Sequence, residues 1–150
     1  MEQKFNLKEI EQKVLDFWSE NSVYKKAVQK NSKGSRFKFT DGPPYTTGAI
    51  HLGTAWNKVM KDVVLRYKRF QGYHVRDQPG YDMHGLPIEV KVEEDLKLKN
   101  KRDIEEKIGI EKFIELCRKF ALDNLDLMNK QFSRLGVWMD WDAPYRTIDN

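Results

Sequence analysis

The sequence predicts an α/β fold with a parallel sheet, and three observations lead to this prediction. "RFKFTD" at residues 36–41 and "YHVRDQ" at residues 73–78 have the character of short strands. Between them, from about His51, apolar residues recur at helical spacing up to Gly72, which is typical of a helix C-terminus. A strand, a helix and a second strand in this order form a βαβ unit, in which the strands pair in parallel.

The composition indicates a globular protein, which we expect to be cytoplasmic and to have no membrane partner. The chain has 150 residues, of which 33% are charged and 39% hydrophobic, enough for one domain with a core. No apolar run approaches the roughly 18 residues of a membrane-spanning helix, and the N-terminal sequence lacks a secretory signal. Cys117 is the single cysteine, so we expect no internal disulfide and no metal site. A net charge of +4 permits a nucleic-acid or phosphate partner without requiring one.

Two further helices flank the βαβ unit. Residues 7–20 carry apolar side chains at helical spacing after a capping-box-like Asn6 and Glu9, and a polar turn follows at residues 31–35. Residues 111–135 predict a long helix. Its expected apolar face comprises Cys117, as a structural thiol, with Ala121, Leu125, Met128, Phe132 and Leu135. We expect this stripe and an unpaired sheet edge to promote association.

The remaining helical segments differ in their expected exposure. The helix after His51 should bury one face, and this face comprises Met60, Val63, Val64 and Tyr67. A helix is also expected around residues 88–98. Because six basic and six acidic side chains lie between residues 91 and 107, this stretch should be a solvated helical surface.

Two unusual loops, residues 41–54 and 79–89, follow the predicted strands. Ligands of parallel α/β sheets bind at the carboxyl ends of strands, so both loops are candidates for a site. The first loop, "DGPPYTTGAIHLGT", ends at a helix N-terminus, where unpaired N–H groups attract phosphate. There His51 and Thr54 add side-chain donors, and Gly53 leaves room for a flat group such as a base. Pro43 and Pro44 form either a rigid turn or an apolar wall suited to an aliphatic side chain.

The second loop, "PGYDMHGLPIE", contains a carboxylate in apolar surroundings. Asp82 lies among glycines and apolar residues, where an unpaired charge is costly, so it should meet a cation. That cation is either a protein group or a ligand ammonium. The pattern leaves three roles open for His84: a helix cap, a core histidine or a substrate contact.

Together the loops resemble those of the class I aminoacyl-tRNA synthetases, and within them the isoleucyl enzymes. "DGPPYTTGAIHLG" is similar to the family's first signature, and "GYDMHGLPIE" to its "GWD-x-HGLP-x-E" segment. The resemblance implies that residues 1–35 are an N-terminal helical extension and 36–150 the first half of a Rossmann-like catalytic domain with flanking helices. The HIGH region of the family then corresponds to Pro44, Tyr45, Thr46, Thr47, Gly48, Ala49, Ile50, His51, Leu52, Gly53 and Thr54.

This resemblance also implies roles for individual residues. His51, Gly53 and Thr54 would bind ATP, with His51 and Thr54 as the catalytic pair. Gly42 and Pro43 would line the isoleucine pocket, and Asp82 would hold the α-ammonium group of the amino acid. Thr54 departs from the family's usual histidine, and a neutral hydroxyl donor makes a weaker bond than a charged one.

The implied reaction is the activation of isoleucine with ATP and Mg²⁺, followed by transfer of the isoleucyl group to tRNA(Ile). The family's lysine-rich "KMSKS" loop has no counterpart here, so the chain resembles a fragment that is inactive alone. The missing C-terminal half would supply most tRNA contacts. Two other readings stay open: a small adenylyltransferase, and an RNA-binding module whose basic stretch is "KVMKDVVLRYKRF".

Overall fold

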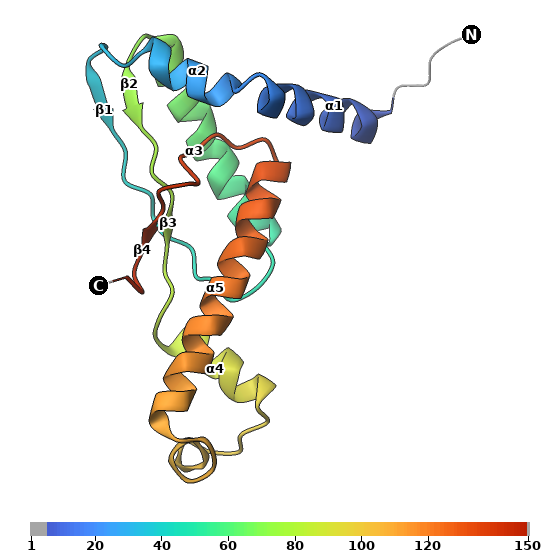
Figure 1. Ribbon diagram of the computed structural model, residues 1–150, viewed down its shortest axis with the longest axis vertical. Coiled ribbons are helices and arrows are strands. Elements are labelled where there is room, and N and C mark those ends of the chain that lie inside the picture. The colour runs from blue at the N-terminus through green and yellow to red at the C-terminus, as the bar shows by residue number, and fades with distance from the viewer. Residues whose placement is uncertain (1–5, 150) are drawn as a thin grey trace.

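Short parallel strands and longer helices make up the chain, and the structure, a computed structural model, describes residues 6–149 (Figure 1). The elements in chain order are α1 (Leu7–Glu20), α2 (Val23–Lys30), β1 (Arg36–Lys38), α3 (Leu52–Phe70), β2 (His74–Arg76), β3 (Gly80–Tyr81), α4 (Leu86–Asp95), the π-helical turn η1 (Ile104–Ile108), α5 (Ile110–Arg134) and β4 (Tyr145–Arg146). The first five residues of the predicted 1–35 extension, and Asn150, lie outside the described residues. The predicted α/β class is confirmed as helices combined with short parallel strands.

The predicted βαβ unit is present, because β1 and β2 pair in parallel and α3 connects them. Each strand is three residues long, shorter than predicted. The ladder is interrupted where the Gly80 N–H donates to the Asp41 carboxylate at 2.9 Å instead of to a backbone carbonyl. Backbone pairing resumes where the Asp82 N–H donates to the Pro44 carbonyl at 2.9 Å.

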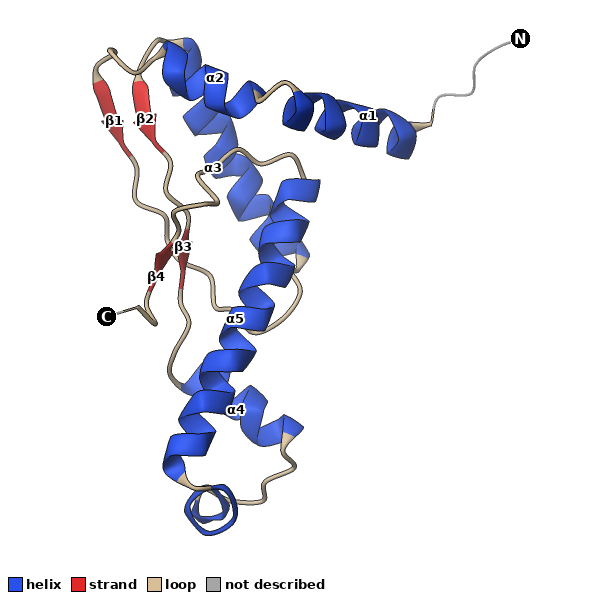
Figure 2. Cartoon of the chain, viewed as in Figure 1, coloured by secondary structure: helices blue, strands red, loops and turns tan. Residues whose placement is uncertain are grey.

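A third parallel segment, which the sequence pattern did not reveal, lies beside the second. β3 pairs in parallel with β4, with Gly80 opposite Tyr145. An isolated parallel bridge joins Tyr45 to Asp82. Three chain segments therefore meet around Asp82, and Figure 2 shows α3 and α5 to one side of these strands.

The N-terminal part contains two helices where the sequence pattern predicted one. α1 has the predicted bounds, and the Asn6 side chain caps it by accepting a bond from the Glu9 N–H at 3.5 Å. α2 was missed because it is short and starts after Ser22, which has a left-handed backbone (φ 49°). The predicted polar turn follows it. α1 is tied to α5 by an ion pair between Glu11 and Arg134 at 2.7 Å.

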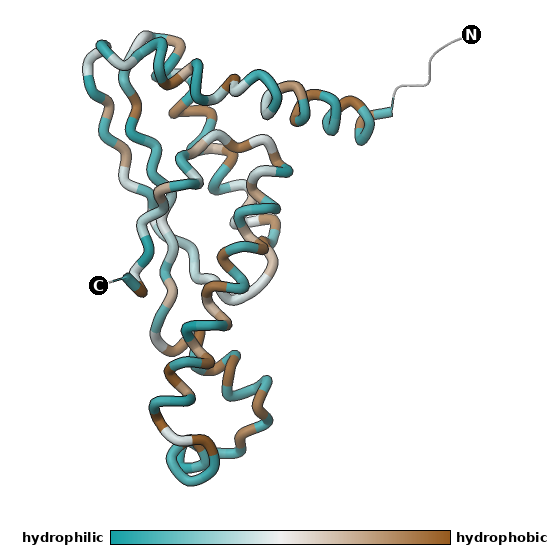
Figure 3. The backbone as a smooth tube through the Cα atoms, viewed as in Figure 1, coloured by the Kyte–Doolittle hydropathy of each residue, from teal (hydrophilic) through white to brown (hydrophobic). Residues whose placement is uncertain are grey.

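The predicted buried face of α3 is wrong. Its apolar stripe is between 49% and 58% exposed, and this stripe comprises Met60, Val63, Val64 and Tyr67. The buried residues of α3 are instead Lys58, Asp62, Leu65 and Arg69. The tube of Figure 3 shows the hydropathy along the chain, in which apolar and polar residues alternate over this helix.

Ion pairs explain how α3 buries charged residues. Lys58 pairs with Asp41, and Arg69 pairs with Asp77. Asp62 binds Arg66 at 2.7 Å and also accepts a bond from the Trp138 N–H at 3.0 Å. Because each buried charge has a partner of opposite sign or a hydrogen-bond donor, the cost of desolvation is offset.

α5 has nearly the predicted bounds and supplies the main core. Its buried side chains include Ala121, Leu125, Met128 and Phe132, which pack with Tyr81, Met83 and Ile88. Leu135 is an exception, since it follows the helix end and is 47% exposed. Most of the α5 stripe is therefore not available for the expected association, whereas α1 and α3 both carry exposed apolar side chains. Cys117 packs at the edge of this core, where burial raises the pKa of its thiol.

The helix predicted around residues 88–98 starts and ends earlier than expected. α4 starts at Leu86 and stops at Asp95, and Lys97 then takes a left-handed backbone (φ 55°) that ends the helical path. The solvated helix expected over 91–107 is thus a helix end, a turn and η1. Asp103 is buried within this turn and accepts a bond from the Lys99 N–H at 3.0 Å.

Candidate functional site

The two unusual loops lie against each other, as their positions after the predicted strands suggested. The Asp82 N–H donates to the Pro44 carbonyl at 2.9 Å, and the Thr46 N–H donates to the Asp82 carbonyl at 3.1 Å. These two bonds form a short parallel bridge between the loops. The backbone, and not only the side chains, therefore fixes the first loop relative to the second.

His51 caps the start of α3. Its Nδ1 accepts bonds from the Gly53 N–H at 3.1 Å and the Thr54 N–H at 3.3 Å. Two of the N–H groups expected to be free for phosphate are therefore occupied in this structure. Because a backbone N–H can only donate, the Nδ1 of His51 is the acceptor and the ring proton is on Nε2. The exposed Nε2–H group is the donor that His51 offers to a ligand.

Gly53 allows the imidazole to fold back over the helix start. A Cβ at this position would lie 3.0 Å from His51 Cε1 and 3.1 Å from Nδ1. These distances are shorter than ordinary contacts, so a larger residue would displace the ring. The structure thus gives Gly53 a reason within the chain itself, beside the expected room for a flat base.

An open pocket of about 260 Å³ gathers the predicted ATP-binding residues. Its lining residues are Gly42, Pro44, His51, Gly53, Thr54, Asn57 and Lys58. Pro43 and Asp82 do not line it. A larger cavity of about 410 Å³ lies against β1 and β2, but none of the predicted site residues lines it.

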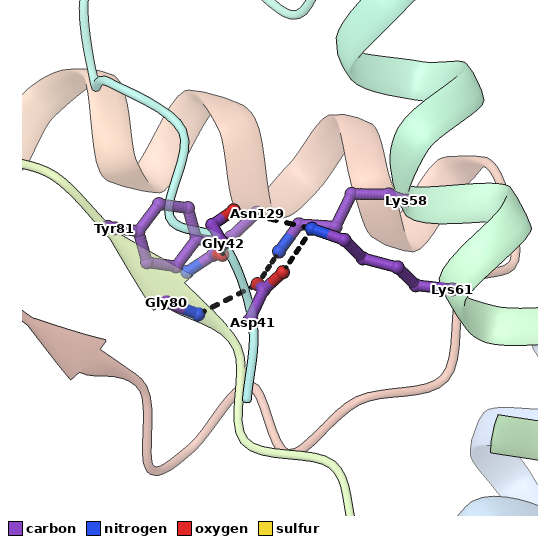
Figure 4. A network of polar contacts seen from close by, with 7 residues as sticks. All are labelled: Asp41, Gly42, Lys58, Lys61, Gly80, Tyr81 and Asn129. Carbon is purple, nitrogen blue, oxygen red and sulfur yellow. Dashed lines mark hydrogen bonds and ion pairs between the residues drawn. The ribbon is translucent and has the colours of Figure 1, made fainter. Parts of the chain in front are cut away.

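Beneath the first loop lies a buried network centred on Asp41 (Figure 4). The Asp41 carboxylate binds Lys58 through Oδ2 and Lys61 through Oδ1, the latter at 2.6 Å. Oδ2 also accepts the Gly80 N–H at 2.9 Å, and Lys61 donates to the Gly42 carbonyl at 3.3 Å. One carboxylate therefore connects α3, the first loop and the start of the second loop.

Lys58 is almost fully enclosed, with its side chain 1% exposed. Its Nζ lies over the rings of Tyr81 and Phe132, 5.6 Å and 5.3 Å from their centres. Burial lowers the pKa of the Lys58 ammonium, while the Asp41 carboxylate opposes this shift. We assign Lys58 as a cation held by Asp41, because two aromatic faces and a carboxylate favour the charged form.

Asp82 lies outside this pocket and has protein partners of its own. The Thr147 hydroxyl donates to Asp82 Oδ1 at 3.3 Å, and His84 Nδ1 is 3.8 Å from the same oxygen. Within residues 6–149, no lysine or arginine nitrogen lies within 4.0 Å of this carboxylate. Of the two cations predicted for Asp82, a protein group or a ligand ammonium, the structure places only the His84 ring nearby, and the ligand ammonium stays a prediction.

Two of the three roles left open for His84 are wrong. Its side chain is 65% exposed, so it is not a core histidine. α4 has Gly85 at its N-cap and no side-chain cap bond, so His84 does not cap the helix. Its Nδ1 instead contacts the Thr147 Oγ1 at 2.7 Å.

The predicted amino-acid-binding residues Gly42 and Pro43 both lie on the exposed part of the first loop. Pro43 packs on the second loop, because a Cβ added to Gly80 would lie 3.3 Å from Pro43 Cβ. The two prolines thus face different surroundings, Pro44 toward the pocket and Pro43 toward Gly80.

Sequence reasoning missed Asp41, Lys58 and Thr147 as parts of this region. For Lys58 a signal existed, since Lys58, Asp62, Leu65 and Arg69 recur at helical spacing with charges of both signs. For Thr147 there was none, because β4 is two residues long.

The chain is similar to known synthetases over nearly its whole length. Residues 13–150 match the family described as tRNA synthetases class I (I, L, M and V). The isoleucine–tRNA ligase of Thermococcus kodakarensis is 58% identical over 147 residues, which are 98% of this chain and 14% of that protein. The isoleucine–tRNA ligase of Methanocaldococcus jannaschii is 56% identical over 143 residues, 95% of this chain and 14% of that protein. The chain thus spans about one seventh of the length of these relatives.

A solved structure shares the fold. It is a LeuRS of Agrobacterium radiobacter K84, crystallised as a ternary complex with tRNA and LeuAMS. The TM-score is 0.70 at 23% identity, over 97% of this chain and 16% of that one. At this identity the likeness concerns the arrangement of helices and strands alone.

Proposed function

The chain belongs to the class I tRNA synthetases, and from this membership we propose that it is the amino-terminal part of an isoleucine–tRNA ligase. The complete enzyme would activate isoleucine with ATP to isoleucyl-adenylate and transfer the isoleucyl group to tRNA(Ile). In this proposal residues 1–35 are a helical extension, and residues 36–150 are the first half of a Rossmann-like catalytic domain.

The observation that carries the proposal is the backbone bridge between the two loops. The bridge consists of the backbone bonds of Asp82 with Pro44 and Thr46. It joins the first loop, which borders the candidate nucleotide pocket, to the second loop, which carries the proposed ammonium ligand Asp82. Amino-acid activation needs ATP and the amino acid side by side, since the carboxylate attacks a phosphate and releases pyrophosphate. One rigid bridge between the two loops suits this reaction.

On the nucleotide side, His51, Gly53 and Thr54 would bind ATP. The His51 Nε2–H would donate to phosphate oxygens, because Nδ1 is already occupied by the helix start. Lys58 lines the same pocket but is committed to Asp41, so its contribution to phosphate binding would be through its charge. On the amino-acid side, Gly42 and Pro43 would contact the isoleucine side chain and Asp82 the ammonium group.

The other partners are proposed on the same basis. Mg²⁺ would arrive with ATP as the substrate complex; among the described residues, no group of three or more histidine, cysteine or acidic residues could hold a metal ion. tRNA(Ile) would bind mainly through parts of the synthetase outside this chain, and we expect the enzyme to act in the cytoplasm. From Asn6 to Asp149, no helix is long and apolar enough to cross a membrane.

The alternative readings have less support. Identity of 54–59% to isoleucine–tRNA ligases over nearly the whole chain favours a ligase over a small adenylyltransferase. The basic stretch that suggested an RNA-binding module is largely used inside the chain. Four of its five basic residues form ion pairs with Asp41, Asp62 or Asp77, and these are Lys58, Lys61, Arg66 and Arg69.

Asp82→Asn in a complete synthetase tests the proposed function. We expect the dissociation constant for isoleucine to rise about 10- to 100-fold, as loss of a charge-assisted hydrogen bond of about 1.5–3 kcal/mol would give. The effect should be smaller than for a fully buried ion pair, because the Asp82 side chain is 26% exposed. ATP affinity should change little. Equilibrium binding of each substrate measures both effects.

Asp123→Asn serves as the matched control, because Asp123 is an exposed partner of Lys119 on α5. It should leave both affinities unchanged. Equal loss of isoleucine and ATP affinity in Asp82→Asn would contradict the assignment of Asp82 to the ammonium group.

Thr54→His should retain ATP binding and tighten it by about 1 kcal/mol, the difference between a neutral and a charge-assisted bond. The structure makes this substitution tolerable, since His51, not Thr54, is the N-cap of α3. Calorimetry of ATP binding to the complete enzyme measures the change. Abolished binding would show that Thr54 has a structural role that histidine cannot fill.

A further inference from the structure

Thr147 lies beside Asp82 because of the register of β3 and β4. Gly80 is opposite Tyr145, and the Thr147 N–H donates to the Tyr81 carbonyl at 3.2 Å. The parallel register therefore continues to the pair Asp82 and Thr147. Paired residues of neighbouring parallel strands project their side chains on the same face of the sheet. The backbone thus presents the Thr147 hydroxyl to the Asp82 carboxylate.

The hydroxyl of Thr147 has three neighbours, and they use its full capacity. Its Oγ1 accepts a bond from the Met83 N–H at 2.9 Å, donates to Asp82 Oδ1 at 3.3 Å and lies 2.7 Å from His84 Nδ1. A hydroxyl has one proton and two lone pairs. The hydroxyl proton points to Asp82 Oδ1, and one lone pair of Oγ1 accepts the Met83 N–H. His84 Nδ1 therefore donates its proton to the second lone pair of Oγ1.

We propose that Thr147 is the positioning residue of the amino-acid site, an inference that rests on the proposed function. Its hydroxyl fixes Asp82 Oδ1, and Asp82 Oδ2 has no hydrogen-bond partner within residues 6–149. Oδ2 is therefore the oxygen presented to the isoleucine ammonium. The same hydroxyl holds His84 in the Nδ1–H form, which keeps a donor beside the carboxylate.

The position of Thr147 explains why a residue far along the chain matters to this loop. Asp82 and Thr147 are 65 residues apart in the sequence, and the β3–β4 pairing is their connection. A carboxylate fixed before binding loses less rotational freedom when the ligand arrives. Removal of the hydroxyl should weaken isoleucine binding without touching the nucleotide pocket.

The test compares Thr147→Val, Thr147→Ser and Thr40→Val in a complete synthetase, by isoleucine-dependent ATP–pyrophosphate exchange. Thr40→Val makes the same chemical change at an exposed residue that follows β1. In Thr147→Val we expect the KM for isoleucine to rise about tenfold and the KM for ATP to stay within about twofold. Thr147→Ser keeps the hydroxyl and should stay within about twofold for both, as should Thr40→Val.

A second readout follows the ring of His84 directly and needs no substrate. In the ¹⁵N-histidine-labelled chain at a pH where the imidazole is neutral, long-range ¹H–¹⁵N correlations distinguish the two tautomers. Wild type and Thr147→Ser should show Nδ1–H, and Thr147→Val should shift His84 toward Nε2–H.

The two readouts separate failure of this inference from failure of the proposed function. A wild-type enzyme that exchanges with isoleucine, together with an unchanged isoleucine KM in Thr147→Val, would overturn the role of Thr147 alone. An equal rise of both KM values, or an unchanged tautomer in Thr147→Val, would do the same. A complete wild-type enzyme without isoleucine-dependent exchange would overturn the proposed function and, with it, this role.

Discussion

The 150-residue chain alone should show no isoleucine-dependent ATP–pyrophosphate exchange above background. Within residues 6–149 its strands form two separate parallel pairs, β1 with β2 and β3 with β4, whereas a doubly wound sheet forms its ligand crevice between two complete halves. The candidate nucleotide pocket is small and open, about 260 Å³, which is below the range of about 300–1,000 Å³ that small-molecule sites enclose. Each missing electrostatic donor to a transition state costs about 2.7–4 kcal/mol, so the loss should amount to several orders of magnitude.

Supplying the remainder of the synthetase, in trans or by fusion, should restore exchange. The apolar stripe of α3, which includes Val63 and Tyr67, is exposed in the chain and offers a surface for this remainder. The assay requires chain freed of host synthetase, with His51→Ala in the fused protein as the control for contamination. Exchange by the chain alone at the rate of the fused protein would show that these residues are a complete catalyst.

Local sequence patterns predicted the helices and loops that depend on nearby residues. α1, α3 and α5 follow from apolar spacing and end signals within each segment, and their bounds agree closely with the prediction. The two loops were found for the same reason, since prolines and glycines restrict the backbone wherever they occur. That the loops meet followed from the topology of parallel strands.

Features that depend on distant partners escaped prediction. The sequence pattern favoured burial of the apolar residues of α3 over Lys58 or Arg69. Asp41 and Asp77 pair with these two cations and offset the cost of removing them from water. Asp41 is 17 residues from Lys58 in the sequence, and Asp77 is 8 residues from Arg69. Neither carboxylate lies on α3, so the buried face of this helix depends on contacts made by the tertiary fold. β4 and Thr147 were invisible because a two-residue strand has no periodicity.

Asp41→Asn should destabilise the chain by about 3–5 kcal/mol, because it leaves the Lys58 ammonium buried without its carboxylate. The remaining contacts of Lys58 are the faces of Tyr81 and Phe132, which offset only part of this loss. The Gly80 N–H and Lys61 would also lose a charged acceptor. Urea unfolding followed by tryptophan fluorescence measures the change, which should appear in the midpoint with an unchanged slope.

Two further variants show whether the loss of stability arises from the Lys58 ammonium, which is left buried without its carboxylate. Adding Lys58→Met to Asp41→Asn removes the unpaired cation, and the double variant should regain most of the lost stability. Glu9→Gln breaks the exposed pair with Lys13 on α1 and should leave the urea midpoint nearly unchanged, because solvent screens a pair at the surface. If Asp41→Asn were as mild as Glu9→Gln, Asp41 would not hold the two loops through a buried charge. If the double variant were no more stable than Asp41→Asn, the cost would come instead from the lost bonds to Gly80 and Lys61.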